Sequence, residues 1–260
     1  MKHLKTLALR TLSTLVWGLS ALGSSLAAEP VAPAPASLII TYHVAPAARP
    51  AFRRELETTG VQQFQAWKNV GMLSTYRLLF SRYADSDNWD AMALLTFPSV
   101  AEAERWRGVE RESPAGLTQG ALAMTRTIQT TAVSMARGKA AAETPTNPVY
   151  LVIPYANLVS ASDYLKYADG YMAPQFDGLI DESVLSRYEL FVATFSAGRP
   201  WSSMVILEYR NNDALARRDT AEGSVRSRLS ARPEWKAFSD TKKSIREEKQ
   251  LVIADQISLR

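Results

Sequence analysis

The chain has 260 residues, of which 47% are hydrophobic, and its 30 Lys and Arg against 26 Asp and Glu give a formal net charge of +4. It contains no cysteine and two histidines, which excludes disulfides, thiolate metal sites and a thiol nucleophile, and leaves too few histidines for a His-rich metal centre. So small a net charge also argues against nucleic acid as a partner, because nucleic-acid binding needs a basic surface to neutralise phosphates.

The N-terminal segment, residues 1–28, has the three-part order of a secretory signal peptide. Two lysines and Arg10 precede an apolar stretch, and small residues ending in Ala27 and Ala28 form the cleavage site. We expect cleavage after Ala27 or Ala28 and a periplasmic or secreted mature protein, with no membrane contact after cleavage. An uncleaved N-terminal anchor is the alternative. Removal of residues 1–28 takes away three basic residues and no acidic one, which lowers the formal net charge from +4 to +1.

Two Pro/Ala-rich segments divide the mature chain. Residues 29–36 form an extended leader, because proline fixes φ and lacks the amide hydrogen that regular structure needs. Residues 139–148 have a similar composition and form a linker. They separate two stretches of similar length, 37–138 and 149–260, which we interpret as two α+β repeats.

The two stretches are copies of one unit. Shifting the sequence so that Ser37 meets Val149, which we call the repeat offset, aligns them without a gap from these residues onwards. Tyr76 then matches Tyr188, and Trp89 matches Trp201. Each copy has the hydrophobic pattern of a strand, a helix, a hairpin, a charged helical region and a final strand. The expected strands are 38–44, 75–83, 89–97 and 127–134 in the first copy, and 149–155, 187–195, 201–209 and 251–258 in the second.

The order βαββαβ is that of a ferredoxin-like unit, and it occurs twice. One such sheet has helices on one face and leaves its other apolar face bare. We expect the sheet of the tandem copy to cover this apolar face. The sequence therefore predicts the α+β class, with two facing sheets that form an α+β barrel within a single chain.

Two short patterns carry a resemblance to a known family. They are W-x-x-M-x-x-x-E-Y at 201–209 and R-P-E-W at 232–235. With them the chain resembles the dimeric α+β barrel superfamily, and its second half is similar to the branch that contains NIPSNAP proteins and antibiotic-biosynthesis-monooxygenase-like domains. The resemblance implies a ligand site in the barrel interior or between sheet and helices. The superfamily includes cofactor-free oxygenases, isomerases, haem-dependent enzymes and proteins without known activity, so function has to be argued from the site.

His43 is the sole histidine of the mature chain and is matched by Tyr155 at the repeat offset. A histidine on a strand can be a haem ligand or a general base near neutral pH, and the alternative is a structural hydrogen-bonding role. We include both matched residues in the predicted ligand-binding set.

Arg77 and Glu189 occupy matched positions on the second strand of each copy and have opposite charges. Strand alternation places Arg77 on the same face as Leu79, and Glu189 on the same face as Phe191. If that face lines the barrel, the two charges approach each other in its interior. The alternative is a rim position with both groups in water. Glu208 interrupts an apolar strand where the first copy has Thr96, which indicates specialisation of one half or exposure near a strand end.

No phosphate-binding loop, nucleophile elbow or metal-ligand spacing occurs in the sequence. We therefore expect a periplasmic binding protein whose barrel cavity holds a small apolar or aromatic molecule, without a cofactor, as a monomer or a homodimer. The alternative is a cofactor-independent or haem-assisted enzyme of the monooxygenase-like or isomerase-like kind.

Overall fold

The computed structural model describes residues 36–258. The expected signal peptide and nearly all of the leader lie outside the described residues. The first half contains β1 (Ser37–Val44), α1 (Arg49–Glu55), η1 (Leu56–Gly60), α2 (Val61–Asn69), β2 (Thr75–Ser81), β3 (Ala91–Thr96), α3 (Val100–Glu112), η2 (Pro114–Gly116), α4 (Gln119–Met124) and β4 (Thr125–Ala140). The second contains β5 (Val149–Asn157), α5 (Ala161–Tyr167), η3 (Ala168–Met172), α6 (Ala173–Asp181), β6 (Leu185–Ala193), β7 (Ser203–Tyr209), α7 (Asn212–Ala216), α8 (Arg218–Ser230), α9 (Pro233–Ile245), β8 (Arg246–Glu248) and β9 (Val252–Ile257).

Eight strands pair in a closed antiparallel ring, in the order β7-β6-β4-β1-β3-β2-β9-β5 and back to β7. Each half supplies four neighbouring strands, β4-β1-β3-β2 and β9-β5-β7-β6, and the halves join where β2 pairs with β9 and β4 pairs with β6. Ring closure leaves no open edge among these eight strands. The predicted α+β barrel within one chain is confirmed, with the two sheets merged into one.

The seam between β4 and β6 changes the expected end of the first half. We predicted a final strand over 127–134, but β4 continues to Ala140, because residues 137–140 pair with β6 instead of entering a loop. The connection between the halves is therefore the segment 141–148. The short β8 lies outside the ring and pairs with the end of β5.

The helices of both halves recur at the repeat offset. The segment α1-η1-α2 starts at Arg49 and ends at Asn69, and its counterpart α5-η3-α6 starts and ends at the matched residues Ala161 and Asp181. The π-helical turns η1 and η3 inside these segments match in the same way. A π-helical turn is rare and needs a specific local sequence, so its recurrence supports a common origin of the halves.

The first strand departs from this offset by one residue. Tyr42 of β1 pairs with Ala91, and Tyr155 of β5 pairs with Ser203, the residue that matches Ala91 at the repeat offset. Tyr155 is therefore the counterpart of Tyr42, and our match of His43 with Tyr155 is wrong. A shift of one residue moves every side chain of a strand to the opposite face.

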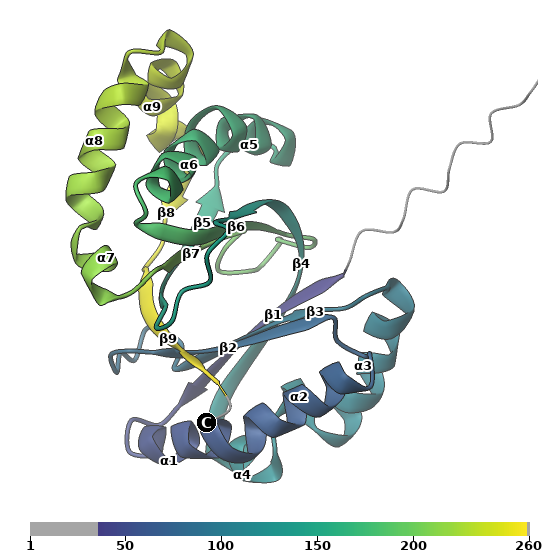
Figure 1. Ribbon diagram of the computed structural model, residues 1–260. Helices are drawn as coiled ribbons and strands as arrows, with labels where there is room; N and C mark the ends of the chain where they lie inside the picture. The colour runs from purple at the N-terminus through teal and green to yellow at the C-terminus, as the bar shows by residue number, and fades with distance from the viewer. Residues whose placement is uncertain (1–35, 259–260) are drawn as a thin grey trace, which may run out of the picture. The chain divides into compact units, whose positions relative to one another are not determined.

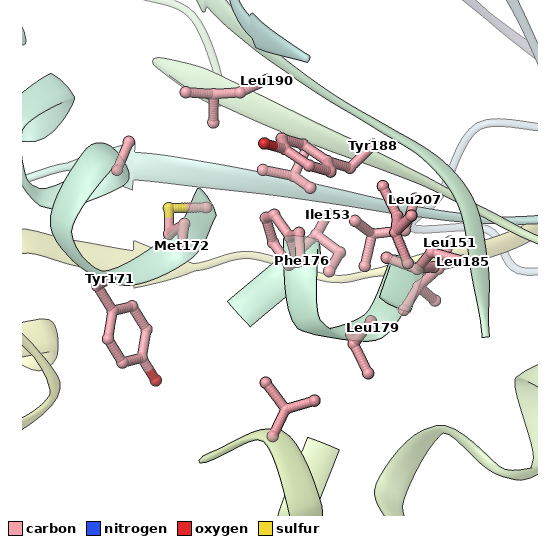
Figure 2. Packing of buried hydrophobic residues seen from close by; sticks show 14 of the residues in the cluster. Leu151, Ile153, Tyr171, Met172, Phe176, Leu179, Leu185, Tyr188, Leu190 and Leu207 are labelled. Carbon is pink, nitrogen blue, oxygen red and sulfur yellow. The ribbon is translucent and has the colours of Figure 1, made fainter. Parts of the chain in front are cut away.

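Buried side chains form three clusters. One packs the outer face of the first-half strands against α1–α4, and a second packs the outer face of the second-half strands against α5, α6, α8 and α9 (Figure 1). In the second, Phe176 of α6 lies beside Ile153 and Leu207 of the sheet (Figure 2). Burying such a side chain stabilises the fold by about 1.5–3 kcal/mol.

The third cluster fills the barrel interior. Every strand of the ring contributes at least one buried apolar side chain to it, and Trp89 and Trp201 both belong to it, as their matched positions predict. Eight-stranded barrels are just wide enough for side chains to fill. The apolar centre of the barrel is therefore occupied by side chains. Within residues 36–258, no helix is both long enough and apolar enough to cross a membrane.

Candidate functional site

Arg77 and Glu189 meet inside the barrel. Arg77 of β2 donates from Nη1 to Oε2 of Glu189 on β6 over 2.6 Å, and from Nη2 to Oε1 over 3.3 Å. Both side chains are only 12% exposed. Burial alone would lower the pKa of Arg77, but the neighbouring Glu189 carboxylate raises it above its ordinary value. The two charges thus form a buried forked ion pair on the inner face of the barrel, and not a rim contact in water.

Glu208 lies in the same end of the barrel, where β7 ends. Its Oε1 accepts a hydrogen bond from Oγ of Ser186 over 2.6 Å, and its Oε2 lies 2.8 Å from the hydroxyl of Tyr150. That hydroxyl is also 2.7 Å from Oε1 of Gln256, and a phenol has one proton to donate to one of them at a time. Burial raises the pKa of Tyr150 far above its usual range, so the hydroxyl stays protonated. Glu208 is buried and hydrogen-bonded, which excludes the exposed strand-end alternative.

Arg187 links the two carboxylates loosely. Its Nη1 lies 3.7 Å from Oε1 of Glu189 and its Nε lies 3.9 Å from Oε2 of Glu208, and both distances are longer than a hydrogen bond. The Nε atom is buried and has no hydrogen-bond partner within residues 36–258. The side chain as a whole is 43% exposed. The buried Nε cannot reach a ligand, but the rest of the side chain lines the open space and forms no hydrogen bond within residues 36–258, whereas the donors of Arg77 are committed to Glu189.

A cavity of about 830 Å³ opens at this end of the barrel. One wall is the connection 141–148, and the other walls come from the strand ends. A second space of about 110 Å³ adjoins Arg77, Arg187 and Glu189. We call this region the barrel-mouth site, and the polar residues of its lining include Thr75, Arg77, Tyr150, Ser186, Arg187, Glu189, Glu208 and Gln256.

His43 lies at the opposite end of the barrel, where β1 ends. It lines a separate cavity of about 360 Å³ together with polar residues, among them Arg49, Asp90 and Arg126. Asp90 accepts hydrogen bonds from Nε of Arg49 and from the amide of Val44, each over 2.8 Å. A haem needs two apolar faces around its ring, and this charged lining does not supply them. The surroundings of His43 therefore do not fit a haem.

Tyr155 lies outside the barrel, under the helices of the second half. This corrects its predicted place beside the other site residues, and the cause is the one-residue register shift of β5. Three of the five predicted residues, Arg77, Glu189 and Glu208, are thus brought together, whereas His43 and Tyr155 lie elsewhere. Sequence reasoning missed Arg187, although it lies two positions before Glu189 and strand alternation puts it on the same face. Tyr150 gave no signal, since it sits within an apolar run.

The fold of the chain recurs among solved structures. A scan against protein-family models finds no match, and a search of curated proteins finds none. Among solved structures, a proposed monooxygenase from Lactobacillus acidophilus NCFM matches with a TM-score of 0.53 and 10% identity over 86% of this chain and 95% of its own. An anthrone oxidase-like protein matches with a TM-score of 0.53 and 11% identity over 87% of this chain and 92% of its own. A proposed monooxygenase from Fusobacterium nucleatum matches with a TM-score of 0.51 and 12% identity over 87% of this chain and 94% of its own.

At this level of identity the similarity concerns the fold alone. It agrees with the closed ring of eight antiparallel strands that the structure shows. The finer assignment to the NIPSNAP branch stays a prediction. The chain thus has the dimeric α+β barrel fold, closed within a single polypeptide.

Proposed function

We propose that the chain is an enzyme of the monooxygenase-like or isomerase-like kind that removes a proton from a small polar substrate in the barrel-mouth site. The observation that carries the proposal is a set of two carboxylates and two guanidinium groups in the walls of two neighbouring spaces. Glu208 lines the larger space and Glu189 the smaller, and Arg77 and Arg187 line both. Burying charges costs several kcal/mol even when they are paired, so a barrel selected for stability alone would have apolar residues there. The neighbours named as proposed monooxygenases and as an anthrone oxidase-like protein favour this enzyme class over a binding protein.

Each residue has a role that follows from its contacts. Glu208 is the general base, and Ser186 and Tyr150 hold its two oxygens in place. Arg187, whose side chain is 43% exposed and lines the cavity, stabilises the negative charge that develops on the substrate when the proton leaves. Arg77 positions Glu189, which in turn limits the freedom of Arg187.

Proton removal from a carbon is the first step of both reaction classes. In isomerisation the proton returns from Glu208 to a different carbon of the same substrate. In oxygenation without a cofactor, the resulting carbanion is oxidised by dioxygen and forms a C–O bond, and the peroxide takes the proton back from Glu208. Loss of water from this hydroperoxide leaves a carbonyl group on the product. His43 has no part in either step, because it lies at the other end of the barrel.

A binding protein is the second candidate function. Both oxygens of Glu208 already accept hydrogen bonds, and such a fixed acceptor suits ligand binding as well as catalysis. We infer that the ligand is polar in either case, because the apolar centre of the barrel is filled by side chains and the open space has a charged wall. We further propose that the protein works in the periplasm, because residues 1–28 have the pattern of a signal peptide.

Hydrogen exchange into small enolisable carboxylic acids tests the enzyme proposal. The purified mature protein is incubated with each compound in D₂O, and loss of the C–H signal is followed by proton NMR. For a compound that exchanges, Glu208→Gln should slow exchange by about 100-fold or more. Arg107→Met is the control, since Arg107 pairs with Glu104 on the surface of α3.

The outcomes separate the two functions. Exchange that depends on Glu208 and not on Arg107 supports the enzyme. Binding of a compound that depends on Arg187, without any exchange or turnover, supports the binding protein. Exchange at equal rates in wild type and Glu208→Gln would contradict the role of Glu208.

A further inference from the structure

Arg246 lies in an aromatic pocket between the sheet and the helices of the second half. Its guanidinium carbon is 3.8 Å from the ring centre of Tyr155 and 5.5 Å from that of Tyr167. Both rings are almost completely buried. The Nη1 atom of Arg246 and the hydroxyl of Tyr167 are buried as well, and neither has a hydrogen-bond partner of standard geometry in the described part of the chain.

No carboxylate within residues 36–258 forms an ion pair with Arg246, although Glu222 and Glu248 line the same cavity. Burial raises the pKa of Tyr155, Tyr164 and Tyr167 above the usual range, so these tyrosines stay neutral. Glu222, which faces the same pocket, forms ion pairs of 2.9 Å with both Arg218 and Arg226. Glu248 is exposed to solvent.

A buried guanidinium without an anionic partner is costly, and stacking on tyrosine offsets only part of that cost. An anion that binds to Arg246 would offset the remaining free-energy cost of burying this charge. A guanidinium presents its donors in a planar fork, which matches the two oxygens of a carboxylate or another small oxyanion.

The space beside Arg246 sets the size of that anion. A cavity of about 50 Å³ lies between the sheet and the helices, and its lining includes Arg246, Tyr155, Tyr171 and Gln175. One water molecule needs a cavity of roughly 10–15 Å³, so this cavity accepts a few heavy atoms and no aromatic ring. We propose that Arg246 and the surrounding tyrosines form a binding site for a small oxyanion of the size of formate or bicarbonate.

The first half of the barrel lacks this arrangement, although its helices and strands are equivalent. There the counterpart of Tyr155 is Tyr42, whose hydroxyl donates to the backbone oxygen of Ala115 over 2.7 Å. At the repeat offset, Phe52 stands opposite Tyr164 and Glu55 opposite Tyr167. Only the second half has the cation and the tyrosines together, so the common fold does not require them. The site is independent of the barrel-mouth site, which lies on the inner side of the sheet.

Titration of the purified mature protein with sodium formate tests the proposal, with binding measured by calorimetry. Wild type and Arg107→Met should bind one formate per chain, and Arg246→Met should show no binding. Saturating formate should raise the Tm of the wild type by about 5–10 °C and leave the Tm of Arg246→Met unchanged. Without formate, Arg246→Met should melt at or above the Tm of the wild type, because it removes an unpaired buried charge.

Two more ligands and one more variant complete the test. Arg246→Lys keeps the positive charge and loses the planar fork of donors, so it should weaken formate binding by about 10-fold or more. This variant tests the proposal even if Arg246→Met does not fold. Bicarbonate should bind at the same site, and benzoate should not bind there. Equal formate binding by wild type and Arg246→Lys would overturn the proposal. So would a Tm that Arg246→Met lowers equally with and without formate, because Arg246 would then have only a structural role. Benzoate binding as tight as formate would overturn the size limit and the small-anion assignment.

Discussion

Removal of the positive charge from the Arg77–Glu189 pair should destabilise the protein strongly. In Arg77→Met, the carboxylate of Glu189 stays inside the barrel with an exposed fraction of only 12% and without its partner at 2.6 Å. Breaking a buried pair in this way costs about 3–5 kcal/mol. Arg187 lies 3.7 Å from the same carboxylate and compensates in part, so we expect about 3 kcal/mol. For a domain of this size that corresponds to a fall in Tm of about 6–12 °C.

The double variant Arg77→Met/Glu189→Leu should recover most of that loss, because two apolar side chains of similar volume replace the pair. Urea unfolding of the wild type, both single variants and the double variant closes a double-mutant cycle, and a coupling energy of about 2 kcal/mol or more is the expected result. If the double variant is as unstable as the sum of the single variants, the charges are not coupled and the reasoning about a buried pair is refuted. A stable double variant that has lost activity would place the pair in the function of the barrel-mouth site.

Three further predictions concern other parts of the chain. Gly116→Ala should lower the free energy of unfolding by about 2–4 kcal/mol, because the new Cβ would lie 2.7 Å from the ring of Phe64 at a φ of +71°. The control Gly198→Ala is also at positive φ but has open space around it, and it should cost about 1 kcal/mol. Equal losses in the two variants would contradict the packing argument. Burial and the nearby Asp177 raise the pKa of Tyr188 to about 12, so its contribution to stability is complete below pH 10 and is lost as the pH rises toward 12. Tyr188→Phe should therefore flatten the alkaline part of the stability profile, measured by urea unfolding at several pH values, and an unchanged profile would rule this out. Protein recovered from the periplasm should have the intact mass of a chain that starts at or just before Glu29; a mass that includes residues 1–26 would disprove cleavage.

Much of the architecture followed from the sequence alone. Hydrophobic periodicity depends on local chain geometry, so it predicted the βαββαβ order in each half, and the bare face of each sheet predicted the barrel. The same alternation grouped Arg77 with Leu79 and Glu189 with Phe191, but it did not say which strand face lines the barrel, so the meeting of the two charges depended on the structure.

The tertiary structure alone decided which residues complete the site and where the open space lies. The match of His43 with Tyr155 failed because one residue more separates strand from helix in the first half, and only strand pairing reveals such a shift. Tyr150 and Arg246 reach their sites through strand closure and through the edge strand β8, contacts that no local pattern encodes. Whether a barrel holds a ligand in its centre depends on the summed volume of side chains from all eight strands, and that volume is known only once their register is set.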